Sequence, residues 1–308
     1  MSTLLSTLTS TVASRLKTTA GRVAHRGRAI AIGLPLSFIL VFFAVPFLFL
    51  VVYSFFTPVV GGIEQVLTIS NYVDFFTTEL YYNRLVFTLQ LSLFVTLLVT
   101  AIGYPVTYFL TRIRNLLVRR AVIMIFLVSM FTTYVVRSYA WTVLLSKEGV
   151  VSTVGVALGV FAEPTAFVPG YWAVVVGSVY ILLPFYVLTL YPSLRNIDES
   201  LIEASKNLGA GPLRTFYRVT LPLSKSGLIA AALLTYILTA GIYVVPRMLG
   251  NPSNWTIAVL IGRQINENLN IPFSAVMGLV LVGAVLATLL VVLRVTDVDL
   301  GGLGGEQA

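Results

Sequence analysis

Six long apolar runs constrain the fold of this 308-residue chain more than any other feature, because each is long enough to cross a lipid bilayer. Their approximate limits are residues 30–55, 85–110, 121–145, 171–192, 227–246 and 273–293. Hydrophobic residues make up 57% of the chain and charged residues 10%, a composition that excludes an ordinary soluble protein. The sequence therefore predicts an all-α membrane protein with six transmembrane helices.

The placement of lysine and arginine predicts how these helices are oriented. With the N-terminus inside, the segments on the cytoplasmic side hold fifteen of these residues and the outer loops hold only four. Cytoplasmic loops of membrane proteins carry such an excess. Both termini are therefore predicted to be cytoplasmic, and the net charge of +8 reflects topology and not a nucleic-acid partner.

Three parts of the chain differ from the apolar runs. Residues 1–28 carry Leu4, Leu8, Val12 and Leu16 at steps of four, which favours an amphipathic helix on the cytoplasmic membrane surface. Within the membrane domain, residues 29–295, the longest polar stretch is the cytoplasmic loop 195–226. Residues 296–308 are rich in glycine and acids, which predicts a flexible C-terminal tail.

Several kinds of chemical site are missing from the sequence. The chain has no cysteine, and its one histidine, His25, lies in a basic stretch. No Asp, Glu or Lys occurs within the six apolar runs, so they offer no carboxylate to relay protons or bind sodium. No Gly-x4-Gly-Lys-Ser/Thr phosphate loop is present. We therefore expect no catalytic residue, metal or cofactor, and a transporter of this kind has to take its energy from another subunit.

The polar loop is predicted to form two short helices joined by a glycine-rich hinge. Asn196 followed by Glu199 has the spacing of a capping box, which would start the first helix near Ile197. Gly209 can adopt the left-handed conformation that closes a helix, and Pro212 suits the first turn of the next helix.

Both predicted helices are amphipathic. The apolar face of the first carries Ile197, Leu201, Ala204 and Leu208, opposite Glu199, Glu203 and Lys206. The second sets Leu213, Phe216 and Tyr217 against Arg214 and Arg218. These apolar faces either fold back on the protein's own surface or fill a groove on a partner protein.

The stretch from Glu203 to Pro222 resembles the EAA loop of ABC importer permeases. That pattern is Glu-Ala-Ala, a glycine three residues later, nine residues, and Ile-x-Leu-Pro. Five positions match it, while Ser205 replaces the third alanine and Val219 the isoleucine. The resemblance implies that the loop binds an ATPase. The residues implied in this coupling are Glu203, Ala204, Ser205, Gly209, Ala210, Phe216, Leu221 and Pro222.

Two further stretches are similar to those of the spermidine/putrescine permease family: Arg137 to Trp141 with Gly149, and Gly241 to Gly250. This resemblance covers roughly residues 30–295 and implies the type I, MetI-like fold. It also implies a second permease subunit, two ATPase subunits and an extracytoplasmic binding protein, in the cell membrane of a prokaryote. Permeases for ferric iron or phosphonate share these stretches, so a polyamine and another solute remain alternatives. An ion-coupled secondary transporter is a further alternative, disfavoured by the uncharged apolar runs.

Two groups of residues are candidates for the translocation path. Arg137 is the one charged residue within an apolar run; either it extends to the outer membrane interface or it lines the path together with Tyr139 and Trp141. The second group lies in the fifth run and consists of Tyr236, Thr239 and Tyr243. The alternative for this group is ordinary close packing between helices.

Overall fold

The computed structural model describes residues 33, 35–59 and 62–296. The predictions for residues 1–28 and for the tail after residue 296 lie outside the described residues. A helix, Pro35–Ser54, leads into a two-stranded antiparallel hairpin. The hairpin was not predicted from the sequence. The hairpin strands are β1 (Phe56–Val59) and β2 (Gly62–Leu67).

Most of the rest of the described chain is helical. The long helices are α3 (Glu79–Arg112), α4 (Leu116–Phe131), α7 (Tyr171–Arg195), α11 (Lys225–Ala240) and α14 (Ile271–Thr296). The shorter helices are α2 (Ser70–Thr77), α5 (Tyr134–Leu144), α6 (Val150–Ala157), α8 (Glu199–Asn207), α9 (Pro212–Thr215), α10 (Leu221–Leu223), α12 (Val244–Leu249) and α13 (Ile257–Asn266). A π-helical turn, η1 (Phe216–Thr220), joins α9 to α10, and a 3-10 turn, η2 (Pro252–Asn254), precedes α13.

Helices α3, α7 and α11 pack against one another and form the centre of the bundle. Their contact faces bury apolar side chains such as Val95, Ile181 and Ala231. Glycine permits the closest approach: a Cβ atom on Gly103 would lie 2.5 Å from a ring carbon of Tyr186. Small residues of this kind let helix backbones approach closely in membranes, where burial of apolar surface drives association only weakly.

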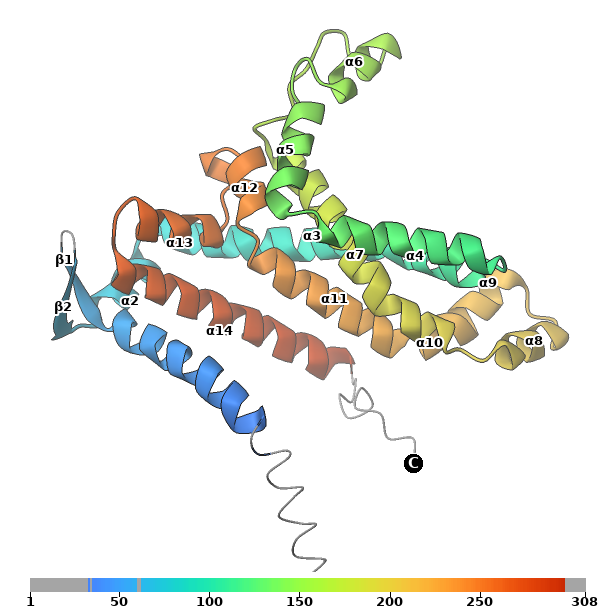
Figure 1. Cartoon of the computed structure of the whole chain (residues 1–308), viewed down its shortest axis with the longest axis horizontal. Helices are drawn as coiled ribbons and strands as arrows, with labels where there is room; N and C mark the ends of the chain where they lie inside the picture. The colour runs from blue at the N-terminus through green and yellow to red at the C-terminus, as the bar shows by residue number, and fades with distance from the viewer. Residues whose placement is uncertain (1–32, 34, 60–61, 297–308) are drawn as a thin grey trace, which may run out of the picture.

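A second apolar cluster joins α14 to α2, α3, α11 and α13. Its fully buried members include Phe75, Ile257, Val276 and Met277. Phe273, at the start of α14, stacks edge-on against Tyr81 of α3 with the ring centroids 4.7 Å apart. This cluster fixes α14 along the flank of the central bundle (Figure 1).

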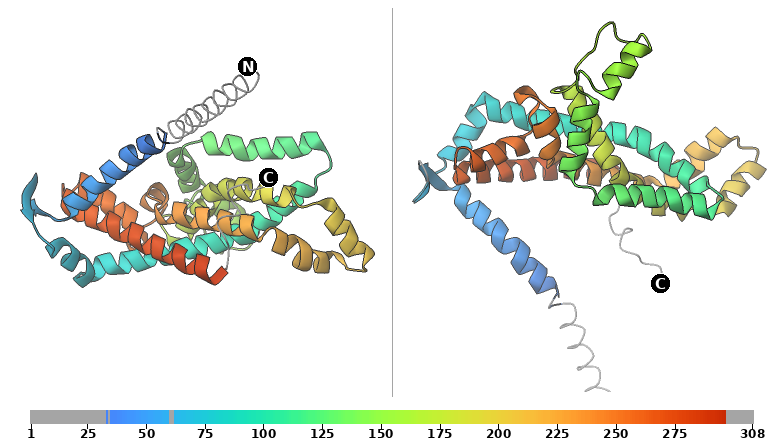
Figure 2. Two further views of the ribbon diagram at one scale, coloured as in Figure 1. Left: turned by 90° about the horizontal axis from the view of Figure 1, so that it is seen from below. Right: turned by 45° about the horizontal axis from the view of Figure 1, so that its top comes forward.

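The helix Pro35–Ser54 stands apart from the bundle along most of its length (Figure 2). Its most apolar window is not buried at all within the described chain. Only its end is held: the side-chain amide of Asn71 donates to the carbonyl oxygens of Ser54 at 3.1 Å and Phe56 at 2.9 Å. An apolar helix exposed in this way has to face lipid or another protein.

Two of the predicted runs are not single helices. The third run, 121–145, is divided between α4 and α5, which bend by 98° at Thr132 and Thr133. Thr133 caps α5, since its hydroxyl accepts from the Val136 amide at 3.4 Å. The fifth run, 227–246, ends as a helix at Ala240, and α12 begins only at Val244. Among the described residues, four helices are long and apolar enough to cross a membrane. The number is six if two bent pairs, Leu116–Phe131 with Tyr134–Leu144 and Pro212–Leu223 with Lys225–Ala240, each form one span. Six spans and cytoplasmic termini therefore stay predictions.

Candidate functional site

The first helix of the predicted loop, α8, begins two residues later than the capping-box prediction. Its N-cap is Asp198, whose carboxylate accepts from the Ser200 amide at 2.9 Å. That hydrogen bond from the Ser200 backbone lowers the pKa of the Asp198 carboxyl below its ordinary value. The predicted N-cap, Asn196, instead caps the end of α7, and its backbone N–H donates to the Pro192 carbonyl at 2.9 Å. The capping-box prediction was wrong because α7 continues to Arg195 and its final turn uses Asn196.

The hinge after α8 has the predicted geometry. Gly209 has φ +81°, in the left-handed region that favours glycine. Its amide donates to the Lys206 carbonyl at 2.9 Å, and the Ala210 amide donates to the Ser205 carbonyl at 3.1 Å. These two bonds form a Schellman motif, which satisfies the last carbonyls of α8. Pro212 occupies the first turn of α9, as predicted.

The loop has one buried isoleucine on the inner side of α8 and an aromatic contact with the membrane bundle. Ile202 of α8 is 6% exposed and is the only residue of that helix classed as buried. Phe216 packs edge-on between Tyr104 and Tyr108 of α3, with ring centroids 5.7 and 5.4 Å away. Ile202 was missed because the sequence pattern favoured the face containing Leu201 and not this isoleucine. Phe216, one of the predicted coupling residues, points into the bundle.

The outer face of the loop is apolar and exposed. Leu201, Leu208, Leu213 and Tyr217 are between 47% and 88% exposed. Between α8 and the second helix lies an open groove of about 370 Å³. Its lining includes the motif residues Ala204, Ser205 and Ala210, with Leu201, Leu208, Arg214, Arg218 and Val219. The predicted apolar face is therefore outward, except that Ile197 precedes the helix and is half-buried.

The last motif residues shape the second helix. Pro222 has no N–H to donate to the carbonyl of Arg218, four residues earlier. The chain forms the wider π-helical turn directly before α10. Leu221 packs against the central cluster, while Pro222 is exposed. Of the eight predicted coupling residues, Phe216 and Leu221 contact the bundle and the others lie nearer the loop surface.

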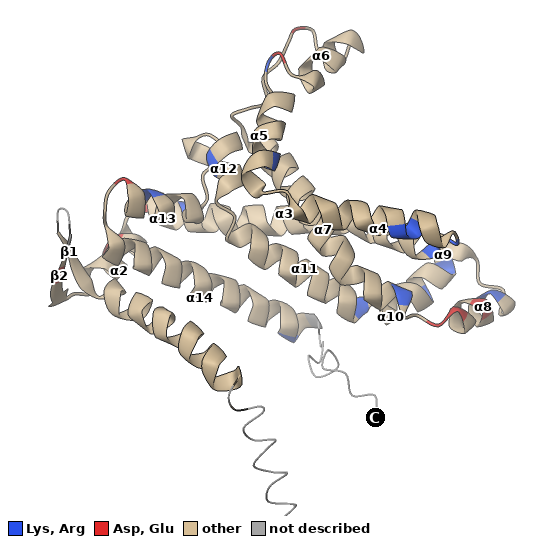
Figure 3. Ribbon diagram, viewed as in Figure 1, with Lys and Arg blue, Asp and Glu red and all other residues tan. Residues whose placement is uncertain are grey.

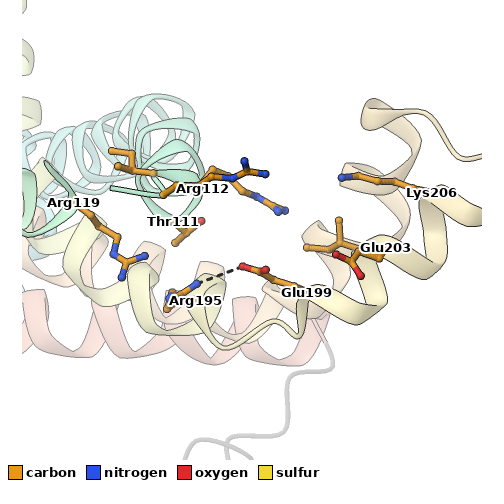
Figure 4. A pocket seen from close by; sticks show the side chains of 10 residues that line it. Thr111, Arg112, Arg119, Arg195, Glu199, Glu203 and Lys206 are labelled. Carbon is orange, nitrogen blue, oxygen red and sulfur yellow. Dashed lines mark ion pairs between the residues drawn. The ribbon is translucent and has the colours of Figure 1, made fainter. Parts of the chain in front are cut away.

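The opposite face of α8 is charged. Glu199, Glu203 and Lys206 line a cleft whose other wall is the basic turn between α3 and α4 (Figure 4). Arg195 pairs with Glu199 at 3.7 Å across one end of the cleft. Many of the charged residues lie at this end of the molecule, around α8, α9, α10 and the start of α4 (Figure 3). The motif glutamate, Glu203, therefore lies on the face opposite the apolar groove.

Arg137 is buried where α5 crosses α7. The residue is 4% exposed, and its Nη1 donates to the Ile181 carbonyl at 3.4 Å, while the guanidinium carbon lies 5.1 Å from the Tyr134 ring centroid. Nε and Nη2 have no hydrogen-bond partner within the described chain. Arg137 and Trp141 also line a cavity of about 450 Å³ in the angle between α4 and α5.

The remaining path candidates do not form one surface. Tyr139 is exposed on α5 and lines no part of the cavity beside Arg137. Tyr236 and Thr239 are buried within α11, and the Thr239 hydroxyl donates to the Thr235 carbonyl at 2.7 Å. Tyr243 is partly exposed in the break before α12. Within the described residues, no group of three or more His, Cys, Asp or Glu side chains could hold a metal.

Comparisons with known proteins agree with this architecture. The solved bacterial ABC transporter involved in import of the acidic polysaccharide alginate has a chain with TM-score 0.72 at 18% identity, covering 89% of this chain and 96% of that one. A chain of the methionine ABC transporter MetNI has TM-score 0.54 at 22% identity, and the match covers 70% of this chain and 94% of that one. These likenesses confirm the predicted type I, MetI-like permease fold.

Curated relatives extend the likeness to the sequence. The spermidine/putrescine transport system permease protein PotB of Escherichia coli is 33% identical over 213 residues, covering 69% of this chain and 77% of that protein. PotB of Salmonella typhimurium is 31% identical over 245 residues, and the match covers 77% of this chain and 85% of that protein. Residues 18–297 match the family described as "Binding-protein-dependent transport system inner membrane component". This chain therefore belongs to that family, as a multi-pass membrane permease of an ABC importer.

Proposed function

We propose that this chain is a non-catalytic permease subunit that imports a polyamine when separate ATPase subunits close and open. The α8–α9 loop would bind an ATPase, and the membrane bundle would form half of the translocation path. A second permease, a second ATPase and an extracytoplasmic binding protein would complete the importer.

The observation that carries the ATPase contact is the outer face of the loop. Leu201 and Leu208 are exposed and line the groove between α8 and the second helix. Large apolar side chains exposed at the polar end of a membrane protein are typical of a protein interface. The left-handed Gly209 turn sets the angle between the two helices that form this surface.

The polyamine assignment is supported by the spermidine/putrescine relatives, which align over more than two thirds of this chain. The molybdenum transport system permease protein ModB of Azotobacter vinelandii is 31% identical but covers only 53% of this chain. Ferric iron and phosphonate remain alternative solutes. The exposed apolar helix Pro35–Ser54 offers a surface for the second permease.

A Gly209→Arg substitution tests the ATPase contact. An L-residue in the left-handed conformation costs about 1–2 kcal/mol, and the long cation would stand on the proposed docking face. The variant should insert normally, lose the ATPase on solubilisation and show no uptake of labelled spermidine by the reconstituted complex. Its matched control is Gly211→Ala on the same hinge, because Gly211 has φ −66° and a Cβ atom there meets nothing within 4 Å.

The control variant should keep both its ATPase and its uptake. Copurification of Gly209→Arg with ATPase at wild-type stoichiometry, together with normal uptake, would show that the loop is not the docking element. Uptake that responds to phosphonate or ferric iron but not to spermidine would instead overturn the solute assignment alone.

A further inference from the structure

The charged cleft on the inner face of α8 lies outside the apolar groove of the proposed ATPase contact, although it contains Glu203, one of the predicted coupling residues. It encloses about 500 Å³ between the α3–α4 turn, the end of α7 and α8. Its lining residues are Thr111, Arg112, Ile113, Arg114, Arg119, Arg195, Glu199, Ile202, Glu203 and Lys206. In Figure 4, the side chains of Arg112 and Lys206 extend toward each other from opposite walls.

Positive charge exceeds negative charge in this cleft. It contains five cationic side chains and two carboxylates, and one ion pair, between Arg195 and Glu199, is formed there. Within the described chain, Arg114, Arg119 and Lys206 have no carboxylate within 4.0 Å, and the Arg112 guanidinium lies over the Tyr108 ring at 5.1 Å. Like charges gathered in a concave site attract an anion.

The wall formed by the α3–α4 turn continues into an exposed apolar surface. Directly after Arg114, the first turn of α4 exposes three apolar side chains, Leu116, Leu117 and Val118. Leu117 is 75% exposed. Apolar side chains beside arginines at the end of a membrane helix are typical of the interface, where the former enter the hydrocarbon and the latter lie among headgroups.

We propose that the cleft binds the phosphate of an anionic lipid headgroup from the adjoining leaflet. The guanidinium groups of Arg114 and Arg119 would hold the phosphate oxygens, and Lys206 would add a point charge from α8. The acyl chains would lie beside the exposed residues at the start of α4. Basic pockets between membrane helices bind lipid headgroups for the same electrostatic reason.

The geometry favours a lipid over an acidic surface of a protein partner. Glu199, Ile202, Glu203 and Lys206 lie on one face of α8, while Leu201, Ala204, Ser205 and Leu208 lie about half a turn away and line the outer groove. A protein seated in the groove would therefore be separated from the cleft by the helix itself. A bound headgroup would connect the α3–α4 turn to Lys206 and so restrain α8.

Native mass spectrometry of the full chain in detergent tests this proposal, with phosphatidylglycerol and phosphatidylcholine added in equal amounts. Wild-type protein should retain phosphatidylglycerol preferentially. The double variant Arg114→Gln, Arg119→Gln should retain about tenfold less, because it loses two charge-assisted contacts. Arg120→Gln is the matched control, since Arg120 is the next residue on α4 but does not line the cleft.

Lys206→Gln provides a second variant that leaves the α3–α4 turn unchanged, and it should reduce retention severalfold even if the double variant fails to insert. Equal retention of the two lipids, or an equal loss in Arg120→Gln, would overturn the proposal. Millimolar pyrophosphate provides a further test. If it displaces the lipid from the wild-type protein but not from the cleft variants, the site would be assigned to a soluble phosphate instead. Displacement of the retained phosphatidylglycerol by added ATPase would assign the cleft to that protein.

Discussion

The hydroxyl oxygens of Ser205 and Thr215 lie 3.0 Å apart and join α8 to the last residue of α9. Thr215 is buried, whereas Ser205 is half-buried at the edge of the outer groove. Ser205 occupies the position at which the EAA pattern has its third alanine. This hydrogen bond therefore supplements the Gly209 hinge with a side-chain link that an alanine at this position could not form.

Ser205→Ala should loosen the hinge without abolishing transport. Loss of this bond leaves the buried Thr215 hydroxyl without its partner, at a cost of about 1 kcal/mol. Hydrogen exchange of the α8 and α9 amides should become several times faster. The double variant Ser205→Ala, Thr215→Val should accelerate exchange by less than the sum of the two single effects, because both polar partners are then removed. Additive effects would contradict a direct link.

The Asp198 cap should make the start of α8 sensitive to acid. Because the pKa of Asp198 is lowered in the folded chain, its stabilisation is complete above the ordinary value of 3.8 and is lost as the pH falls through the lowered value. Asp198→Ala should speed exchange of the Ser200 and Leu201 amides at neutral pH. Asp198→Asn should keep the cap and remove its pH dependence. Asn196→Ala is the control and should leave α8 unchanged.

Arg137→Met should leave the thermal midpoint of the isolated chain unchanged or raised. The buried guanidinium has one long hydrogen bond, and replacement of buried charges by apolar residues of similar volume is neutral or stabilising by about 1–4 kcal/mol. Uptake by the complete importer should nevertheless fall at least tenfold if Arg137 serves the path. Arg263→Met, at an exposed ion pair, is the comparison. A lower midpoint for Arg137→Met would show that the arginine is satisfied within this chain.

Single cysteines can test the path because the chain contains none. Tyr243→Cys should react with a membrane-impermeant thiol reagent in the resting protein, since this side chain is 40% exposed. Tyr236→Cys and Thr239→Cys should stay unlabelled at rest, because both positions are buried. Labelling of these two during ATP turnover would place α11 on the path. Absence of labelling in every state would leave them as packing residues.

The purified chain should neither bind nor hydrolyse ATP, because its sequence contains no phosphate loop. Nucleotide binding measured by calorimetry, after removal of every copurifying ATPase, provides the check. Hydrolysis that persists in such a preparation would contradict the assignment of a separate ATPase subunit.

Local chemistry explains which features of the loop were predictable. Gly209 and Pro212 were placed correctly because positive φ and a missing N–H are properties of single residues. The helix start was misplaced because Asn196 and Asp198 are both good caps, and the length of α7 decided between them. The break at Thr132 and Thr133 was missed because the two flanking helices together form one run that is apolar enough to cross a membrane.

The sequence by itself determined that this chain is a membrane bundle with an exposed polar loop, because bilayer-length apolar runs and charge placement act without reference to the fold. Only the tertiary structure decided which faces of the loop turn inward. Phe216 packs against the bundle, Ile202 is buried on the inner side of α8, and Glu203 faces the basic turn of a helix pair remote in sequence. Such choices depend on contacts between distant elements, which no local pattern specifies.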